Sequence, residues 1–242
     1  MTQVIFIIKL KDIGENMNTK TKLFGIEVDK ISVEKQTIDD IEIVADLYYD
    51  PLKSGDNYIY RYCLDINLIN SSNENKEITV ILFNPSEYNL SKNNKNAFID
   101  KTITNVIKMI NDDDRFGKIR ILNLFPTINS TPDDLIKNQL KYSYSDKEMK
   151  EIKKRLDANV DILENIKNST VFLAWGQLGN KIKLVKEYKA SIYKKIVENN
   201  NLILIFCPSK KDYPKHPGRL DLDCCRNCYG RSGKIRLIEF KP

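Results

Sequence analysis

The sequence predicts a three-layer α/β/α fold with a central four-stranded parallel sheet and an N-terminal β-rich extension. Four short apolar segments are typical of buried strands: residues 78–83, 119–122, 170–174 and 202–206. Between them, apolar residues recur at steps of three and four, which is the period of an amphipathic helix. Alternating strands and helices favour a parallel sheet with right-handed crossovers and helices on both faces.

Each of the first three strands is followed by one predicted helix. The apolar stripe after the first strand consists of Phe98, Ile103, Val106, Ile107 and Ile110. After the second strand it consists of Met149, Ile152, Leu156, Val160 and Leu163. After the third it consists of Ile182, Val185, Ile192 and Ile196. Each stripe is one helix face that needs a sheet to cover it.

The first seventy residues have a β pattern instead. Residues 41–49 and 58–69 are rich in β-branched and aromatic side chains, and Asp50-Pro51 and Gly55-Asp56 mark a turn between them. We expect a hairpin packed on the edge of the main sheet. The polar loop 70–76 then divides an extension, residues 1–76, from an α/β domain, residues 77–242.

Composition places the chain among globular proteins. Hydrophobic residues make up 41% and charged residues 30% of its 242 residues, which excludes disordered and fibrous classes. A net charge of +6, from 39 Lys and Arg against 33 Asp and Glu, permits a nucleic-acid partner without requiring one. The apolar run at residues 4–8 is too short for a membrane span or signal core and is read as a strand, so we expect a cytoplasmic protein with no membrane partner.

Polar residues follow the predicted strands at the point where each strand ends. They are Asn84-Pro85-Ser86, Asn123, Trp175-Gly176-Gln177 and Cys207-Pro208-Ser209, with His216-Pro217 shortly after. Ligands of open parallel sheets bind beyond the carboxyl ends of the strands, so these residues are candidates for one site. Each has a structural alternative: Asn84 and Ser86 can cap a helix, Asn123 can bond backbone, Trp175 can pack in the core, and Gly176 can permit a tight turn.

The cysteines raise the alternative of a metal site. Cys224, Cys225 and Cys228 with Cys207 or His216 could supply ligands, but only one Cys-x-x-Cys pair exists, so we expect reduced cysteines, no metal and no other cofactor. Cys207 and His216 as a nucleophilic pair would lack an orienting third group. The single histidine of the chain also excludes any multi-histidine metal site.

The order of several short motifs resembles the bacterial and phage family catalogued as domain of unknown function 1643. These motifs are Arg61 in a β segment, Asn84-Pro85-Ser86, Asp100-x-Thr102, Asn123-Leu124-Phe125, Trp175-Gly176 with Gly179, and His216-Pro217. That family in turn is similar to the uracil-DNA glycosylase superfamily, which implies a uracil-DNA glycosylase-like fold. The sequence departs from that superfamily at Leu82, where Gly is usual, and at Gly218, where Ser is common.

The resemblance implies a role for each motif. Asn84 would position the attacking water and His216 would stabilise the departing base. Asn123 would bond the base edge and Phe125 or Tyr88 would stack on its face. The remaining substrate contacts would come from Pro85, Ser86, Trp175 and Gly176, and DNA-backbone contacts from Ser209, Lys210, Lys211, Lys215, Gly218 and Arg219.

These residue types suit cleavage of an N-glycosidic bond. The transition state carries a cationic sugar and an anionic base, so it needs a donor at the base and a polar group that holds water. We therefore expect a DNA glycosylase that flips out a damaged or modified base of single- or double-stranded DNA, in repair or phage defence. Two alternatives stay open: a non-catalytic module that binds nucleic acid or nucleotides, and a hydrolase or transferase of free nucleosides.

Overall fold

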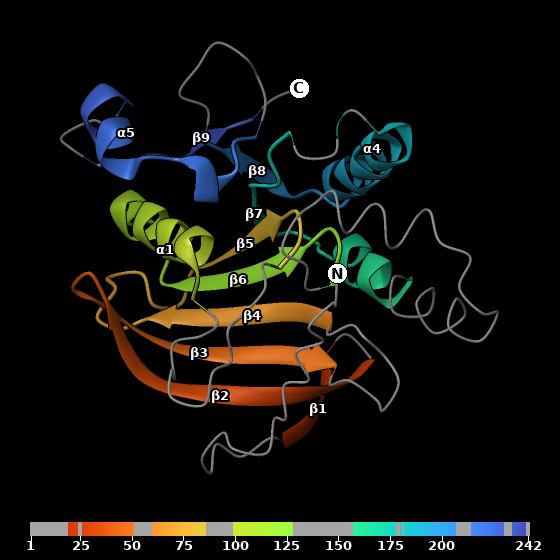
Figure 1. Ribbon diagram of the computed structural model, residues 1–242, viewed down its shortest axis with the longest axis horizontal. Helices are drawn as coiled ribbons and strands as arrows, with labels where there is room; N and C mark the ends of the chain where they lie inside the picture. Colours follow the sequence, from red (N-terminus) through yellow and green to blue (C-terminus); the bar gives the residue numbers. More distant parts are fainter. Residues whose placement is uncertain are drawn as a thin grey trace, which may run out of the picture.

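Nine strands form one mixed sheet in the described part of the chain (Figure 1), in the order β1-β2-β3-β4-β6-β5-β7-β8-β9. The computed structural model describes residues 19–23, 26–50, 60–85, 99–127, 157–177, 180, 182–206, 214–229 and 234–240. The strands are β1 (Thr19–Leu23), β2 (Ile26–Ile38), β3 (Ile41–Asp50), β4 (Tyr60–Leu68), β5 (Glu77–Leu82), β6 (Lys118–Asn123), β7 (Thr170–Leu173), β8 (Leu202–Ile205) and β9 (Ile238–Glu239).

The four strands expected from the sequence are present as β5, β6, β7 and β8, and they pair in parallel. The predicted fold class is nevertheless wrong. The sheet is mixed and mostly antiparallel, with five antiparallel pairings against three parallel ones. The reason lies in β4, which is buried along nearly its whole length. Such a strand needs neighbours on both edges, and it pairs with β3 on one side and β6 on the other.

The N-terminal strands continue the same sheet. The predicted hairpin is confirmed as β3 and β4, which pair antiparallel, and β1 and β2 extend it outward. The division at residue 76 stays a prediction, but β4 on one side of it pairs with β6 on the other. The expected strand at residues 4–8 and most of the expected turn, residues 51–56, lie outside the described residues.

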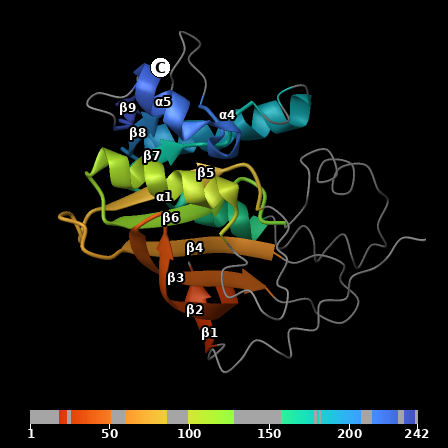
Figure 2. The ribbon, with the colours of Figure 1, turned by 60° about the vertical axis from the view of Figure 1, so that its left-hand side comes forward.

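Helices cover both faces of the parallel part of the sheet (Figures 1 and 2). On one face lie α1 (Lys101–Asp113) and α5 (Leu222–Tyr229), and on the other lie α4 (Lys183–Glu198) and a helix at residues 157–164. The apolar stripes predicted for α1 and α4 are confirmed for Ile103, Val106, Ile107 and Ile110 and for Val185, Ile192 and Ile196, which are buried. Ile182 is half-buried, and Phe98 lies outside the described residues. Residues 149–156 of the remaining stripe lie outside the described residues.

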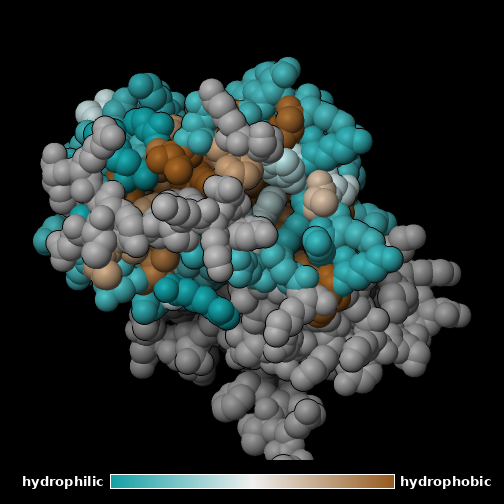
Figure 3. Space-filling model, turned by 90° about the horizontal axis from the view of Figure 1, so that it is seen from above, coloured by the Kyte–Doolittle hydropathy of each residue, from teal (hydrophilic) through white to brown (hydrophobic). Residues whose placement is uncertain are grey.

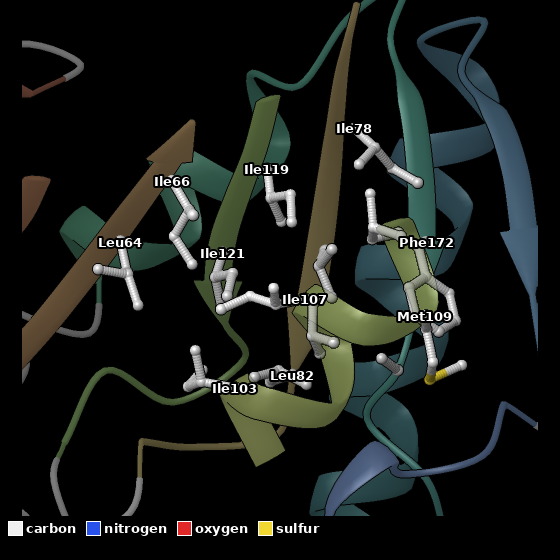
Figure 4. Packing of buried hydrophobic residues seen from close by; sticks show 14 of the residues in the cluster. Leu64, Ile66, Ile78, Leu82, Ile103, Ile107, Met109, Ile119, Ile121 and Phe172 are labelled. Carbon is white, nitrogen blue, oxygen red and sulfur yellow. The ribbon is translucent and has the colours of Figure 1, made fainter. Parts of the chain in front are cut away.

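Two hydrophobic clusters fill the space between the layers. The α1-side core contains Ile103 and Ile107 of α1, which pack on alternate residues of β4, β5 and β6 (Figure 4). The α4-side core contains Val185, Ile192 and Ile196 of α4 with the other faces of the same strands. Burying one such aliphatic side chain contributes about 1.5–3 kcal/mol. A strand residue that belongs to the α1-side core therefore lies on the face of the sheet that α1 covers, and one that belongs to the α4-side core lies on the opposite face.

Two consecutive aspartates at the end of α1 anchor the C-terminal segment. Asp112 accepts hydrogen bonds from Arg226 Nε at 2.7 Å and from the Ile235 backbone amide at 3.3 Å. Asp113, which is completely buried, accepts a hydrogen bond from the Leu237 backbone amide at 2.7 Å and pairs with Arg115. These bonds hold Ile235 and Leu237 in the α1-side core.

The outer surface near α4, α5 and β9 is mainly hydrophilic, with hydrophobic residues visible between the polar ones (Figure 3). The exposed large hydrophobic residues of the described chain are Val197, Leu202 and Ile238. Within the same described residues, none of the helices has the length and apolar character needed to cross a membrane.

Candidate functional site

Three strand ends meet at the carboxyl edge of the parallel strands, as the sequence predicts. Beyond the paired strands, the Leu124 amide donates to the Leu82 carbonyl at 2.9 Å and the Phe125 amide to the Phe83 carbonyl at 3.0 Å. The Ala174 amide donates to Ile81 on the other side of β5. Asn123 ends β6, Asn84 follows β5, and Gly176 follows β7. These three candidates therefore lie side by side.

Asn123 is buried without hydrogen-bond partners for its side chain. It is 0% exposed, and within the described residues neither its Oδ1 nor its Nδ2 has a partner. Side chains alternate along a strand, so Asn123 shares the face of Ile119 and Ile121, which belong to the α1-side core. Its backbone is fixed from the other face, where Asn159 Nδ2 donates to the carbonyls of Asn123 and Leu124, both at 3.0 Å.

His216 lies directly against the end of β7. Gly176 has φ +63°, and a Cβ on it would lie 2.8 Å from the Cβ of His216. Both the positive φ and the close approach require glycine at this position. The imidazole is half-buried, and its Nδ1 has no hydrogen-bond partner within the described residues. His216 thus lies at the same sheet edge as Asn84 and Asn123, and that the three residues line one site stays a prediction.

The first turns of α1 hold the loop that carries His216. Asn105 Nδ2 donates to the Pro217 carbonyl at 2.8 Å and to the Leu220 carbonyl at 3.3 Å. A Cβ on Gly218 would lie 2.4 Å from Thr102 Oγ1 and 3.3 Å from the imidazole. Thr102, Gly218 and His216 thus pack without room for another side chain.

A β-bulge brings a buried arginine to the same face. Tyr48 pairs with Cys63 but Tyr49 pairs with Arg61, so Tyr62 is an extra residue on β4. Paired residues share a face, and Tyr49 belongs to the α1-side core, whereas Tyr62 belongs to the α4-side core. Arg61, which is 1% exposed, is therefore directed to the α1 side.

Burial and neighbouring charges shift the pKa values of His216 and Arg61. Burial, together with the charges of Arg219 and Lys189, lowers the pKa of His216 to about 4, and the Asp100 carboxylate opposes this shift. Burial also lowers the pKa of Arg61 to about 10, again against the effect of Asp100. At neutral pH the imidazole is therefore uncharged, with a cationic guanidinium and an aspartate in the same cluster.

The opposite face of this sheet edge is aromatic. Phe125 packs between Phe83 and Tyr188, with ring centroids 5.2 and 5.4 Å away, and Trp175 lies in the same α4-side core. Lys189 Nζ lies 5.1 Å from the centre of the Phe83 ring and donates to the Gly176 carbonyl at 3.1 Å. Burial lowers the pKa of this lysine to about 8. Phe125 and Trp175 thus lie on the other face from Asn123, and their contact with a base stays a prediction.

The remaining candidates are described only in part. Pro85 is buried, Lys215 and Gly218 are half-buried, and Arg219 is exposed. Ser86, Tyr88, Ser209, Lys210 and Lys211 lie outside the described residues, as does Cys207. Cys225 is buried and Cys224 is exposed. Within the described residues, no group of three or more His, Cys, Asp and Glu could hold a metal ion.

The buried neutral His216 predicts a pH dependence of stability. Its folded-state pKa of about 4 is below the ordinary 6.5, so the unfolded chain binds this proton more tightly. The stabilisation from neutral His216 is thus complete above pH 6.5 and is lost as the pH falls toward 4. Relative to the His216→Gln variant, the wild-type free energy of unfolding should fall by about 3 kcal/mol across this window. Urea unfolding of both proteins at several pH values measures this difference. The same pH dependence of the free energy of unfolding in both proteins would contradict the prediction.

Two polar residues of the site were given no role from the sequence, although Arg61 is one of the motifs of the family resemblance. Arg61 interrupts the apolar run of β4, and Lys189 occupies the stripe position between Val185 and Ile192 of α4. A charged residue at a core position is the signal that could have identified both, because buried charges are rare and need a reason.

The segment of the chain that contains this site also shows which family the protein belongs to. The family model described as "Protein of unknown function (DUF1643)" matches residues 61–218, more than half of the chain. The matched segment begins at Arg61 and ends at Gly218, and both of these residues belong to the site described above. A search of curated proteins finds no match. The chain therefore belongs to the family of proteins of unknown function DUF1643.

Proposed function

We propose that this protein is an N-glycosidic hydrolase that excises a damaged or modified base from DNA, in repair or in defence against phage. The observation that carries the proposal is the Asn123 amide, which is fully buried and has no partner within the described residues. An unpaired buried polar group costs about 1–3 kcal/mol. A ligand with a matching donor and acceptor recovers that cost, and nucleobase edges present such pairs.

The spacing of the site supports a nucleoside-sized ligand. Asn123 ends β6, and the Gly176 turn that contacts His216 follows β7, with β5 between the two strands. Neighbouring strands are about 4.8 Å apart, so the two positions are about 10 Å apart. That span accommodates a base together with its sugar.

The electrostatic state of His216 supports cleavage of a bond to a base. A neutral imidazole donates a hydrogen bond to a base that leaves as an anion, and the bond strengthens as that charge develops. Its low pKa keeps it neutral across the physiological range. A base within duplex DNA reaches such a site only when its nucleotide is flipped out. Lys215 and Arg219 flank His216, and with Lys210 and Lys211 they supply cations for phosphates.

The proposed distant relationship to the uracil-DNA glycosylase superfamily rests on the order of the motifs and not on the fold. The identity of Asn84 favours a second candidate function, a nucleotide-binding module without catalysis. An amide is a poor base, and Asn84 Nδ2 donates to the adjacent Pro85 carbonyl at 3.0 Å.

An excision assay separates these functions. The protein is incubated with DNA that contains uracil, other deaminated bases or phage-type modified bases, and with free nucleosides; abasic sites are detected by alkaline cleavage and released bases by chromatography. We expect excision from one class of modified DNA. The matched control is Asn123→Ala, which leaves no partner group unpaired and should fold normally but bind poorly. Binding without excision by the wild type would favour the second function, and activity confined to nucleosides would exclude DNA as substrate.

A further inference from the structure

We propose that Asp100, and not Asn84, is the catalytic group that accepts a proton from the attacking water. The assignment rests on the proposed function and identifies the carboxylate of its reaction. N-glycosidic hydrolysis needs a group that orients water and offsets the positive charge of the sugar, and a carboxylate does both. Asn84 carries no charge and bonds to its own loop.

The position of Asp100 follows from the packing of α1. Asp100 is the residue immediately before this helix and caps it, because its Oδ1 accepts a hydrogen bond from the Ile103 amide at 2.8 Å. Two residues later, Thr102 lies against Gly218 beside the His216 imidazole. The bonds from Asn105 to Pro217 and Leu220 fix the helix to the same loop. The carboxylate is therefore held at the edge where His216 lies.

The charges around Asp100 agree with this position. Among the aspartates and glutamates of the described residues, Asp100 is the one whose negative charge raises the pKa of both Arg61 and His216. Arg61 reaches this place from β4 through the bulge at Tyr62, on the side of the sheet that α1 covers. Because Asp100 is only half-buried, a ligand and a water can approach it.

The reaction balances with these groups and the solvent. The oxygen of water forms a bond to C1′ of the sugar while the bond from C1′ to the base nitrogen breaks. The electron pair of the broken bond leaves with the base, which His216 stabilises by a hydrogen bond. The proton of water passes to the Asp100 carboxylate, which then releases it to solvent, and the base anion takes up a proton from solvent.

The test uses a substitution that keeps the helix cap. Asparagine caps helices as well as aspartate does, so Asp100→Asn removes the charge and preserves α1. We expect single-turnover excision about 10²-fold slower than wild type, from a protein that calorimetry shows to be folded. The matched control is Asp161→Asn, the same chemical change at an exposed position of the helix at residues 157–164; it should keep the wild-type rate.

A second variant tests whether the carboxylate itself is needed. Glycine at a cap costs only a few tenths of a kcal/mol, so Asp100→Gly should stay folded. Added formate should restore its excision rate about tenfold and should not affect Asp161→Asn. Full activity of Asp100→Asn, or no response of folded Asp100→Gly to formate, would overturn the assignment and leave the glycosylase function standing. A wild type that excises no base at all would overturn both.

Discussion

Replacing His216 with alanine is expected to slow single-turnover excision by about 10² to 10³ while DNA binding changes little. The magnitude is that of removing one preorganised donor from a developing anion. His216 is suited to this role because Gly176 packs against its Cβ, Gly218 packs against its ring, and its low pKa keeps the ring neutral. Since the hydrogen bond strengthens only as the base departs, its loss raises the barrier more than it weakens binding.

Single-turnover rates and dissociation constants, measured on the same DNA, separate these two effects. His216→Gln is a useful companion, since its amide donates a hydrogen bond but is less well matched to the site, and it should recover part of the rate. A full excision rate in His216→Ala would show that His216 only completes its loop. A large loss of binding at an unchanged bound-state rate would make His216 a binding residue instead.

The parallel strands and the site edge could be predicted because their signals are local. Residues 78–83 and 170–174 are apolar runs bounded by polar turns, and the stripes of α1 and α4 show a clear helical period. In a parallel arrangement, the carboxyl ends of all the strands lie at the same edge of the sheet. That is why Asn123 and His216, 93 positions apart, could be expected at one edge of the sheet.

The antiparallel strands could not be predicted in the same way. In β2 the alternation of apolar and polar residues is interrupted at Asp29-Lys30 and at residues 34–37, and β9 has only two residues, so neither has a strong local signal. β2 pairs with β3, the next strand along the chain, whereas the place of β9 depends on an edge supplied by β8, which is distant in sequence. The direction of Arg61 depends on one extra residue in β4, and a bulge of this kind cannot be seen in apolar periodicity.

The C-terminal segment also depends on distant partners, and this leads to the largest expected effect on stability. Replacing Asp113 with alanine should lower the free energy of unfolding by about 3 kcal/mol. Asp113 is 0% exposed and accepts the Leu237 backbone amide at 2.7 Å and Arg115 Nη2 at 2.8 Å. Alanine leaves the Leu237 amide buried without this acceptor, and the 39% exposed Arg115 side chain regains only part of its hydration.

In a chain of this length, 3 kcal/mol corresponds to a melting temperature about 6–12 °C lower, which calorimetry measures directly. The matched control is Asp223→Ala, because Asp223 pairs with Arg226 while its side chain is 88% exposed. Screening by solvent limits such a pair to less than about 1 kcal/mol. Equal melting temperatures for the two variants would mean that the hydrogen bonds of Asp113 contribute little to holding the segment at residues 234–240. A drop confined to Asp113→Ala would show that one buried carboxylate joins α1, which carries Asp100, to the end of the chain.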